Sequence, residues 1–129
     1  MSYTIQLLNE EGILLGRWNE DFSFQDEIRV YNDEMYSLLE SLTAPVYFVH
    51  EFANPGLSMQ DIMKGASIAT REEKSTFQHP MIKQIIFVTT SKVMKVAAKG
   101  LNTMSFGNIE VAVFDTVDEA LAFVRTQAA

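Results

Sequence analysis

The sequence predicts a single α/β domain over residues 1–129, with a mixed, mostly parallel sheet of about five strands, an N-terminal β-hairpin and four helices. Three observations support this. Val46–Val49 and Ile85–Val88 are short apolar runs without alternation, as in strands covered on both faces. Apolar residues recur every three or four positions in the segments between and after them, which is typical of helices. Two segments near the N-terminus have the pattern of a hairpin. The expected order is β-β-α-β-α-β-α-β-α, with parallel pairing through right-handed crossovers everywhere except in the hairpin.

The hairpin is predicted from residues 3–18. Tyr3, Ile5 and Leu7 alternate with their neighbours, residues 9–12 supply polar turn chemistry, and residues 13–18 return as a second strand.

The first helix is predicted from an apolar stripe that continues to residue 42. Either Ser23 or Asp21 can accept a hydrogen bond from an unpaired N–H of its first turn. The stripe consists of Phe24, Ile28, Tyr31, Met35, Leu38, Leu39 and Leu42.

The strand Val46–Val49 is followed by the segment that first suggests a function. We expect the strand to stop before His50 and the chain to turn through residues 54–56. A helix should then begin behind Ser58, because Ser58-x-x-Asp61 resembles a capping box, and we expect it to end in the charged segment 71–74.

The C-terminal half repeats the alternation of strand and helix. Residues 85–90 are rich in β-branched side chains and predict a strand. Ser91 can cap a helix whose apolar stripe runs over residues 93–104. Residues 109–114 predict the last strand, and Thr116 begins a capping box before the last helix.

Composition narrows the possible functions. The net charge of −7 argues against general nucleic-acid binding, although residues 64–99 carry seven bases against two acids. The chain has no cysteine, which excludes disulfides, thiolate metal sites and cysteine nucleophiles. We see neither a secretory signal nor a run long enough to span a bilayer, and we expect a cytoplasmic location.

Several polar residues lie near the predicted carboxyl end of the central strand, where open α/β sheets bind ligands. His50 and Glu51, joined by His79, could supply an acid and a base or ligands for a metal. Residues 54–58 could bind an anion at a helix N-terminus, and Ser58 could be a phosphorylation site. The simpler interpretation of residues 54–58 is a turn followed by a helix cap.

Two further helix faces are candidates for binding. Lys92, Lys95 and Lys99 lie on one face, which is either an ordinary solvated face or a surface for an anionic partner or a second copy. Met59 and Met63, one turn apart, either fill the core or line a pocket for apolar ligands.

Two local patterns accompany this element order. They are the ending Val111–Val124 and the segment Gln78–Pro80 that precedes the strand Ile85–Val88. With the element order, they resemble the STAS/SpoIIAA-like family, in particular its branch labelled STAS/SEC14-type. The resemblance covers nearly the whole chain and implies a curled βα superhelix, with helices mainly on one side of a mixed sheet.

The resemblance also implies a location for regulation. In the anti-anti-sigma members, a Ser in an Asp-[Ser/Thr]-[Ser/Thr]-Gly motif at the start of the second helix is phosphorylated, and that surface docks a kinase. Ser58 is similarly placed. Residues 54–59 lack the Asp-Ser-Ser-Gly core, so the resemblance carries over only the location.

We therefore expect a non-enzymatic regulatory or interaction domain that binds a protein partner or a ligand. We expect no metal and no cofactor, and a homodimer is one possible assembly. The candidate contact surface consists of His50, Glu51, Asn54, Ser58, Lys92, Lys95 and Lys99. The alternative is a carrier or sensor of an apolar, lipid-like small molecule, in a pocket lined by Met59, Met63 and aromatic residues. An enzyme that uses His50, Glu51 and His79 is the third hypothesis.

Overall fold

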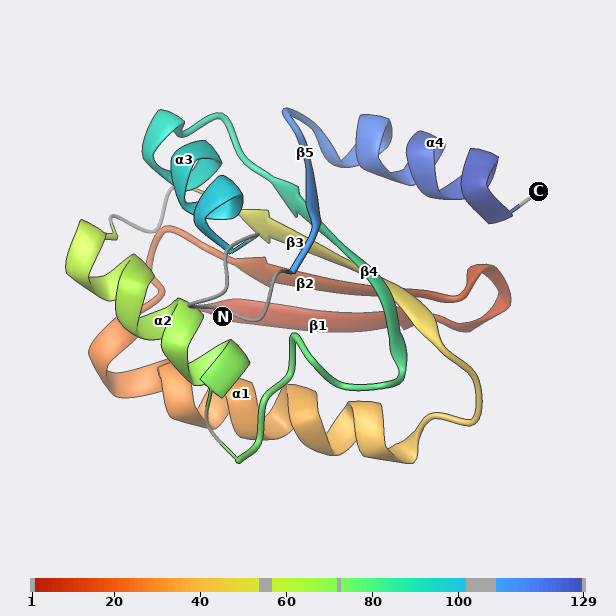
Figure 1. The fold of residues 1–129 in the computed structure, drawn as a ribbon, viewed down its shortest axis with the longest axis horizontal. Coiled ribbons are helices and arrows are strands. Elements are labelled where there is room, and N and C mark those ends of the chain that lie inside the picture. Colours follow the sequence, from red (N-terminus) through yellow and green to blue (C-terminus); the bar gives the residue numbers. More distant parts are fainter. Residues whose placement is uncertain (1, 54–56, 72, 102–108, 129) are drawn as a thin grey trace.

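The computed structural model describes residues 2–53, 57–71, 73–101 and 109–128. Within these residues the chain forms a five-stranded sheet in the order β1-β2-β3-β4-β5, four α-helices and one 3-10 helix (Figure 1). The hairpin β1–β2 is antiparallel and the other pairs are parallel. The predicted α/β class, strand number and element order are confirmed. The elements are β1 (Tyr3–Leu8), η1 (Asn9–Glu11), β2 (Ile13–Trp18), α1 (Phe24–Ser41), β3 (Val46–Phe52), α2 (Met59–Arg71), β4 (Ile82–Val88), α3 (Lys92–Gly100), β5 (Val111–Phe114) and α4 (Val117–Ala128).

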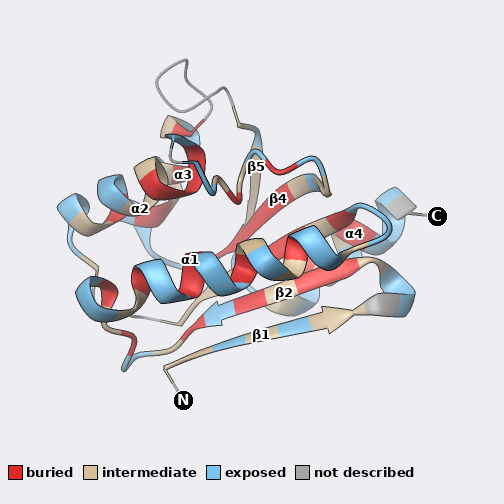
Figure 2. Ribbon diagram, turned by 90° about the horizontal axis from the view of Figure 1, so that it is seen from below, coloured by how far each residue is buried: buried red, intermediate tan, exposed pale blue. Residues whose placement is uncertain are grey.

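The sheet has a different helix layer on each face. Helices α1, α2 and α3 cover one face, and α4 covers the other (Figures 1 and 2). This follows from the topology, because consecutive right-handed crossovers that advance in one direction leave their helices on the same side. Helix α4 follows the last strand, makes no crossover and packs on the opposite face.

The central strands contribute alternate residues to the two layers. Phe48 and Ile85 belong to the core beneath α1–α3, while Val49 and Ile86 pack toward α4. All four side chains are buried. The expectation that these strands are covered on both faces is confirmed.

Some predicted element boundaries were wrong. Strand β3 continues to Phe52 instead of stopping before His50, because residues 48, 50 and 52 alternate inward beneath the helix layer. Strand β4 runs from Ile82 to Val88 instead of 85–90, and β5 starts at Val111 instead of Ile109. Helix α2 ends at Arg71, within the charged segment 71–74 where its end was expected. Ser23 precedes α1, but its side chain makes no capping hydrogen bond to the helix backbone.

Candidate functional site

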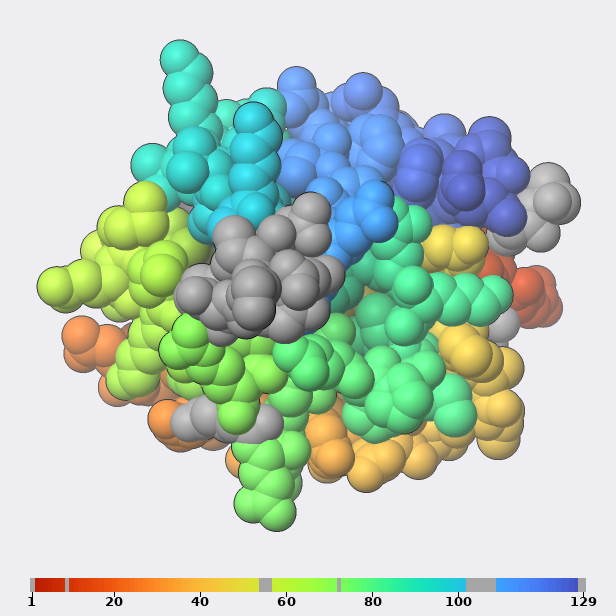
Figure 3. Space-filling model, in the orientation of Figure 1, coloured from red at the N-terminus to blue at the C-terminus, as the bar shows by residue number. Residues whose placement is uncertain are grey.

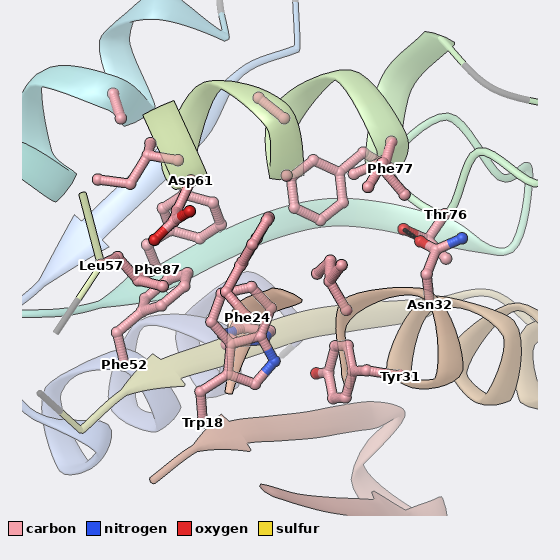
Figure 4. Close-up of a pocket in the computed structure, with 18 of the residues that line it drawn as sticks. Trp18, Phe24, Tyr31, Asn32, Phe52, Leu57, Asp61, Thr76, Phe77 and Phe87 are labelled. Atoms are coloured by element: carbon pink, nitrogen blue, oxygen red, sulfur yellow. Dashed lines mark hydrogen bonds between the residues drawn. The ribbon is translucent and has the colours of Figure 1, made fainter. Parts of the chain in front are cut away.

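A buried cavity lies between the sheet and helices α1–α3 (Figure 4). It offers about 70 Å³ to the centre of a water-sized sphere, which exceeds the roughly 10–15 Å³ that one water molecule needs. Its walls are mostly apolar and include the rings of Trp18, Phe24, Phe52, Phe77 and Phe87. The cavity is therefore a mostly apolar space with more room than a single water molecule needs.

Three polar rings meet at one end of this cavity. Trp18 ends β2, Tyr31 comes from α1 and His50 comes from β3. The ring centroids of Trp18 and Tyr31 are 5.5 Å apart, those of Trp18 and His50 are 4.9 Å apart, and those of Tyr31 and His50 are 5.6 Å apart. Each pair meets edge to face, so the three side chains form one contiguous cluster, which we call the polar cluster.

The polar cluster has no internal hydrogen bonds. Trp18 Nε1, the Tyr31 hydroxyl and both ring nitrogens of His50 find no hydrogen-bond partner among the described residues. The Trp18 N–H lies close enough to the Tyr31 oxygen to oppose the rise that burial causes in the pKa of that hydroxyl, but the two groups do not reach hydrogen-bond geometry. All three residues are nearly inaccessible, with 7%, 5% and 3% of the surface of Trp18, Tyr31 and His50 exposed.

Unpartnered buried polar atoms are rare in folded proteins, and each one calls for an explanation. Leaving such a group without a partner costs about 1–3 kcal/mol. A molecule in the cavity, whether a ligand or ordered water, would supply partners for these four atoms.

Gly16 makes this arrangement possible. It lies in β2 opposite His50 in the parallel ladder. A Cβ atom at this position would lie 2.4 Å from the Tyr31 hydroxyl and 3.3 Å from His50 Cδ2. Because Gly16 has no side chain, the Tyr31 hydroxyl from α1 can lie against β2, next to the His50 ring of the neighbouring strand β3.

Burial also sets the charge of the polar cluster. Desolvation lowers the pKa of His50 from 6.5 to about 3, so the ring is neutral at physiological pH. Burial raises the pKa of the Tyr31 hydroxyl well above its usual value, so the hydroxyl keeps its proton. The polar cluster is therefore uncharged and offers both hydrogen-bond donors and acceptors.

An open cleft adjoins the cavity at the carboxyl edge of the sheet. Its volume is about 510 Å³, and Phe52, Leu57, Ile62 and Met94 line both spaces. These four side chains form a wall that the cavity and the cleft share.

The sequence predicted His50 as part of an exposed contact surface and as a possible partner of His79. His50 is instead buried in the polar cluster. His79 lies before β4, where its Nδ1 accepts a hydrogen bond from the Met81 backbone N–H and its Nε2 lies 3.1 Å from Glu40. In the ladder His50 pairs with Phe87, near the opposite end of β4. The two histidines do not share a site.

Other predicted contact residues lie on the surface. Glu51 receives a hydrogen bond from Arg17 at 2.8 Å and lines the cleft. Lys95 pairs with Asp115 at 2.8 Å, while Lys92 and Lys99 are exposed on the same helix. Asn54 lies outside the described residues. Whether this surface binds a partner stays a prediction.

The two methionines do not line the cavity. Met59 and Met63 are 49% and 47% exposed, so the core interpretation was wrong for them. Neither side chain lines this cavity. The methionines at the cavity are Met35 and Met94, and the aromatic lining that the same hypothesis expected is present.

Ser58 does cap α2. Its hydroxyl accepts a hydrogen bond from the Asp61 backbone N–H at 3.1 Å, and its own backbone N–H donates to the Asp61 carboxylate at 3.2 Å. The predicted capping box is confirmed, with Asp in place of the usual Glu.

We expect Ser58→Ala to lower the free energy of unfolding by about 1 kcal/mol, because the Asp61 N–H loses its acceptor. Urea denaturation measures this change. The matched control is Ser37→Ala at an exposed position within α1, where alanine is the better helix former. Equal effects of the two substitutions would show that the cap contributes nothing.

Sequence reasoning missed Trp18 and Gly16 as site residues and assigned Tyr31 only to a core stripe. A usable signal existed: a glycine inside a predicted strand often marks a close approach by another group. The inward alternation of Phe48, His50 and Phe52 would likewise have placed His50 inside.

Among the described residues, no group of three His, Asp or Glu side chains is placed to hold a metal ion. None of the helices in the described parts of the chain is long and apolar enough to cross a membrane. Comparison of the chain with protein-family models, with curated proteins and with solved structures gave no match.

Proposed function

We propose that this protein is a small-molecule-binding domain, a carrier or sensor whose cavity beneath α1–α3 receives a compact, mostly apolar molecule. The observation that carries this proposal is the clustering of four unpartnered polar atoms at the wall of a mostly apolar cavity. A ligand would gain affinity from the apolar walls and would relieve the unpaired polar groups.

The cavity limits the size of the ligand. An engineered apolar cavity of about 150 Å³ in another protein binds benzene. The cavity of about 70 Å³ in this chain therefore suits a smaller molecule in the described conformation. A larger ligand would have to displace the wall of Phe52, Leu57, Ile62 and Met94 toward the cleft.

A second candidate, protein binding, draws support from exposed apolar side chains on α2 and α3. These helices lie beside each other on one face of the molecule (Figure 3). Met59 and Met63 on α2 and Val93 and Val96 on α3 are the exposed ones. A partner-binding regulatory domain, and membership of the STAS/SpoIIAA-like family, both stay proposals.

The only tryptophan of the chain, Trp18, lies in the polar cluster and provides a direct test of the first candidate. We expect isobutene or methylenecyclobutane, both small hydrocarbons, to shift the single indole N–H resonance saturably. The expected dissociation constant is about 1 mM or tighter, which corresponds to about −4 kcal/mol. The absence of a saturable shift with both hydrocarbons and with acetone and cyclobutanone, their oxygen-bearing analogues, would overturn the proposal.

A filled cavity provides the control. Ala66→Leu adds carbon atoms at the cavity wall and should weaken binding at least about tenfold. The matched control Ala122→Leu makes the same change on α4, at an exposed position away from the cavity, and should leave binding unchanged.

A further inference from the structure

The polar cluster, Trp18, Tyr31 and His50, also limits the chemistry of the ligand. We infer that the ligand carries an uncharged hydrogen-bond acceptor, such as a ketone, aldehyde or ester carbonyl, and places it against the polar cluster. This inference rests on the proposed function and adds the class of ligand.

The numbers of donors and acceptors favour an acceptor on the ligand. Trp18 Nε1 can only donate, neutral His50 has one N–H and one free lone pair, and the Tyr31 hydroxyl has one proton to donate. The polar cluster thus holds three donors. The Tyr31 oxygen and one His50 nitrogen are its only good acceptors, so donor groups outnumber acceptor groups, and none of the donors is paired within the cluster. A ligand oxygen supplies the missing acceptor.

The charges around the cavity favour a neutral ligand. Neither lysine nor arginine lines the cavity among the described residues, and the one carboxylate at its wall is Asp61. An anion would have no cation to pair with and would lie in the field of Asp61, at a high desolvation cost. A cation would be attracted by the Asp61 carboxylate, but at the polar cluster it would face the N–H groups of Trp18 and His50 and would also lose its hydration. The carbonyl group avoids both penalties, because it is polar without net charge.

The shape of the site fits the same class. The polar groups gather over Gly16, where the Tyr31 hydroxyl and the His50 ring both lie close to the backbone of β2. Apolar walls that include Phe24, Phe77 and Phe87 enclose the rest of the space. A ligand with one polar end and a compact hydrocarbon body matches this division. Ordered water is the alternative occupant that the experiment must distinguish.

Two isosteric pairs test the inference: acetone with isobutene, and cyclobutanone with methylenecyclobutane. Within each pair only the carbonyl oxygen is replaced by a methylene group. We expect the ketones to bind and to move the Trp18 N–H proton resonance downfield, as a new hydrogen bond does. Tyr31→Phe keeps the reporter and removes one hydroxyl. It should weaken ketone binding about fivefold and change hydrocarbon binding by less than about twofold.

The outcomes separate the inference from the proposed function. If the hydrocarbons bind and the ketones do not, or if Tyr31→Phe affects both members of a pair equally, the acceptor inference is wrong while the cavity remains a binding site. If no member of either pair binds, the proposed function fails. Charged analogues complete the test: cyclobutanecarboxylate and cyclobutylammonium should produce no saturable shift, and saturable binding of either would overturn the neutral class.

Discussion

Between about pH 6.5 and about pH 4, His50 alone is expected to lower the free energy of unfolding by about 3 kcal/mol. The cause is the burial of its ring beneath α1–α3, which lowers the pKa of His50 from 6.5 to about 3. Below about pH 6.5 the unfolded chain binds a proton at His50, while the folded chain does not bind one until about pH 3. The unfolded state then holds more protons, so stability decreases as the pH falls through this window.

Urea denaturation at several pH values measures this effect, and His50→Phe provides the control. The variant keeps an aromatic ring in the core and keeps His79 and every carboxylate, whose titrations therefore cancel in the comparison. The wild type should lose about 3 kcal/mol relative to His50→Phe between the two pH values. Parallel pH profiles for the two proteins would mean that His50 is solvated or already charged in the folded state.

Much of the fold could be predicted because local patterns and topology agree. The apolar runs at Val46–Val49 and Ile85–Val88 are covered on both faces. The capping residues Ser58 and Ser91 both accept a hydrogen bond from the backbone N–H three residues further along the chain. Each pattern depends on neighbours within a few residues. Such patterns specify element type and, with the handedness rule, the side on which α1–α3 lie.

The cavity could not be predicted in the same way, because it depends on distances between segments remote in the sequence. Trp18, Tyr31 and His50 come from three different elements. Each has an ordinary local explanation: a strand end, a helix stripe and the end of an apolar run. Only their packing over Gly16 shows that their polar atoms lack partners.

The error at His50 has a specific physical cause. Polar residues after an apolar run commonly mark the exposed end of a strand, and Glu51 does lie at the surface, where it pairs with Arg17. His50 faces the other way, because successive residues of a strand point to opposite faces. The change from apolar to polar sequence therefore marked a buried polar site inside the strand, not its end.

The second large effect is expected at Gly16. Gly16→Ala should lower the free energy of unfolding by about 2–3 kcal/mol, because overpacking of a tight site forces neighbours out of place. The new Cβ would lie 2.4 Å from the Tyr31 hydroxyl, and 3.3 Å from both His50 Cδ2 and Phe48 Cε1. Gly100→Ala is the matched control, since a Cβ there meets no atom within 4 Å, and it should cost far less.

Tyr31→Phe should rescue much of this loss. By itself it removes a buried hydroxyl that has no hydrogen-bond partner, so we expect it to raise the free energy of unfolding by about 1 kcal/mol. In the Tyr31→Phe background, the nearest atom retreats from the new Cβ by one C–O bond. Gly16→Ala should then cost about 1–2 kcal/mol less than in the wild type.

The double-mutant cycle, measured by urea denaturation, therefore ties stability to the proposed binding site. The Tyr31 hydroxyl would then lower the stability of the ligand-free protein, although Gly16 leaves the space that it occupies. Such a cost to stability is typical of groups that serve a function. If Gly16→Ala cost the same in both backgrounds, the hydroxyl would not lie over Gly16. If Tyr31→Phe destabilised the ligand-free protein instead, the hydroxyl would already have a hydrogen-bond partner such as ordered water. The main observation in favour of ligand binding at the polar cluster would then be wrong.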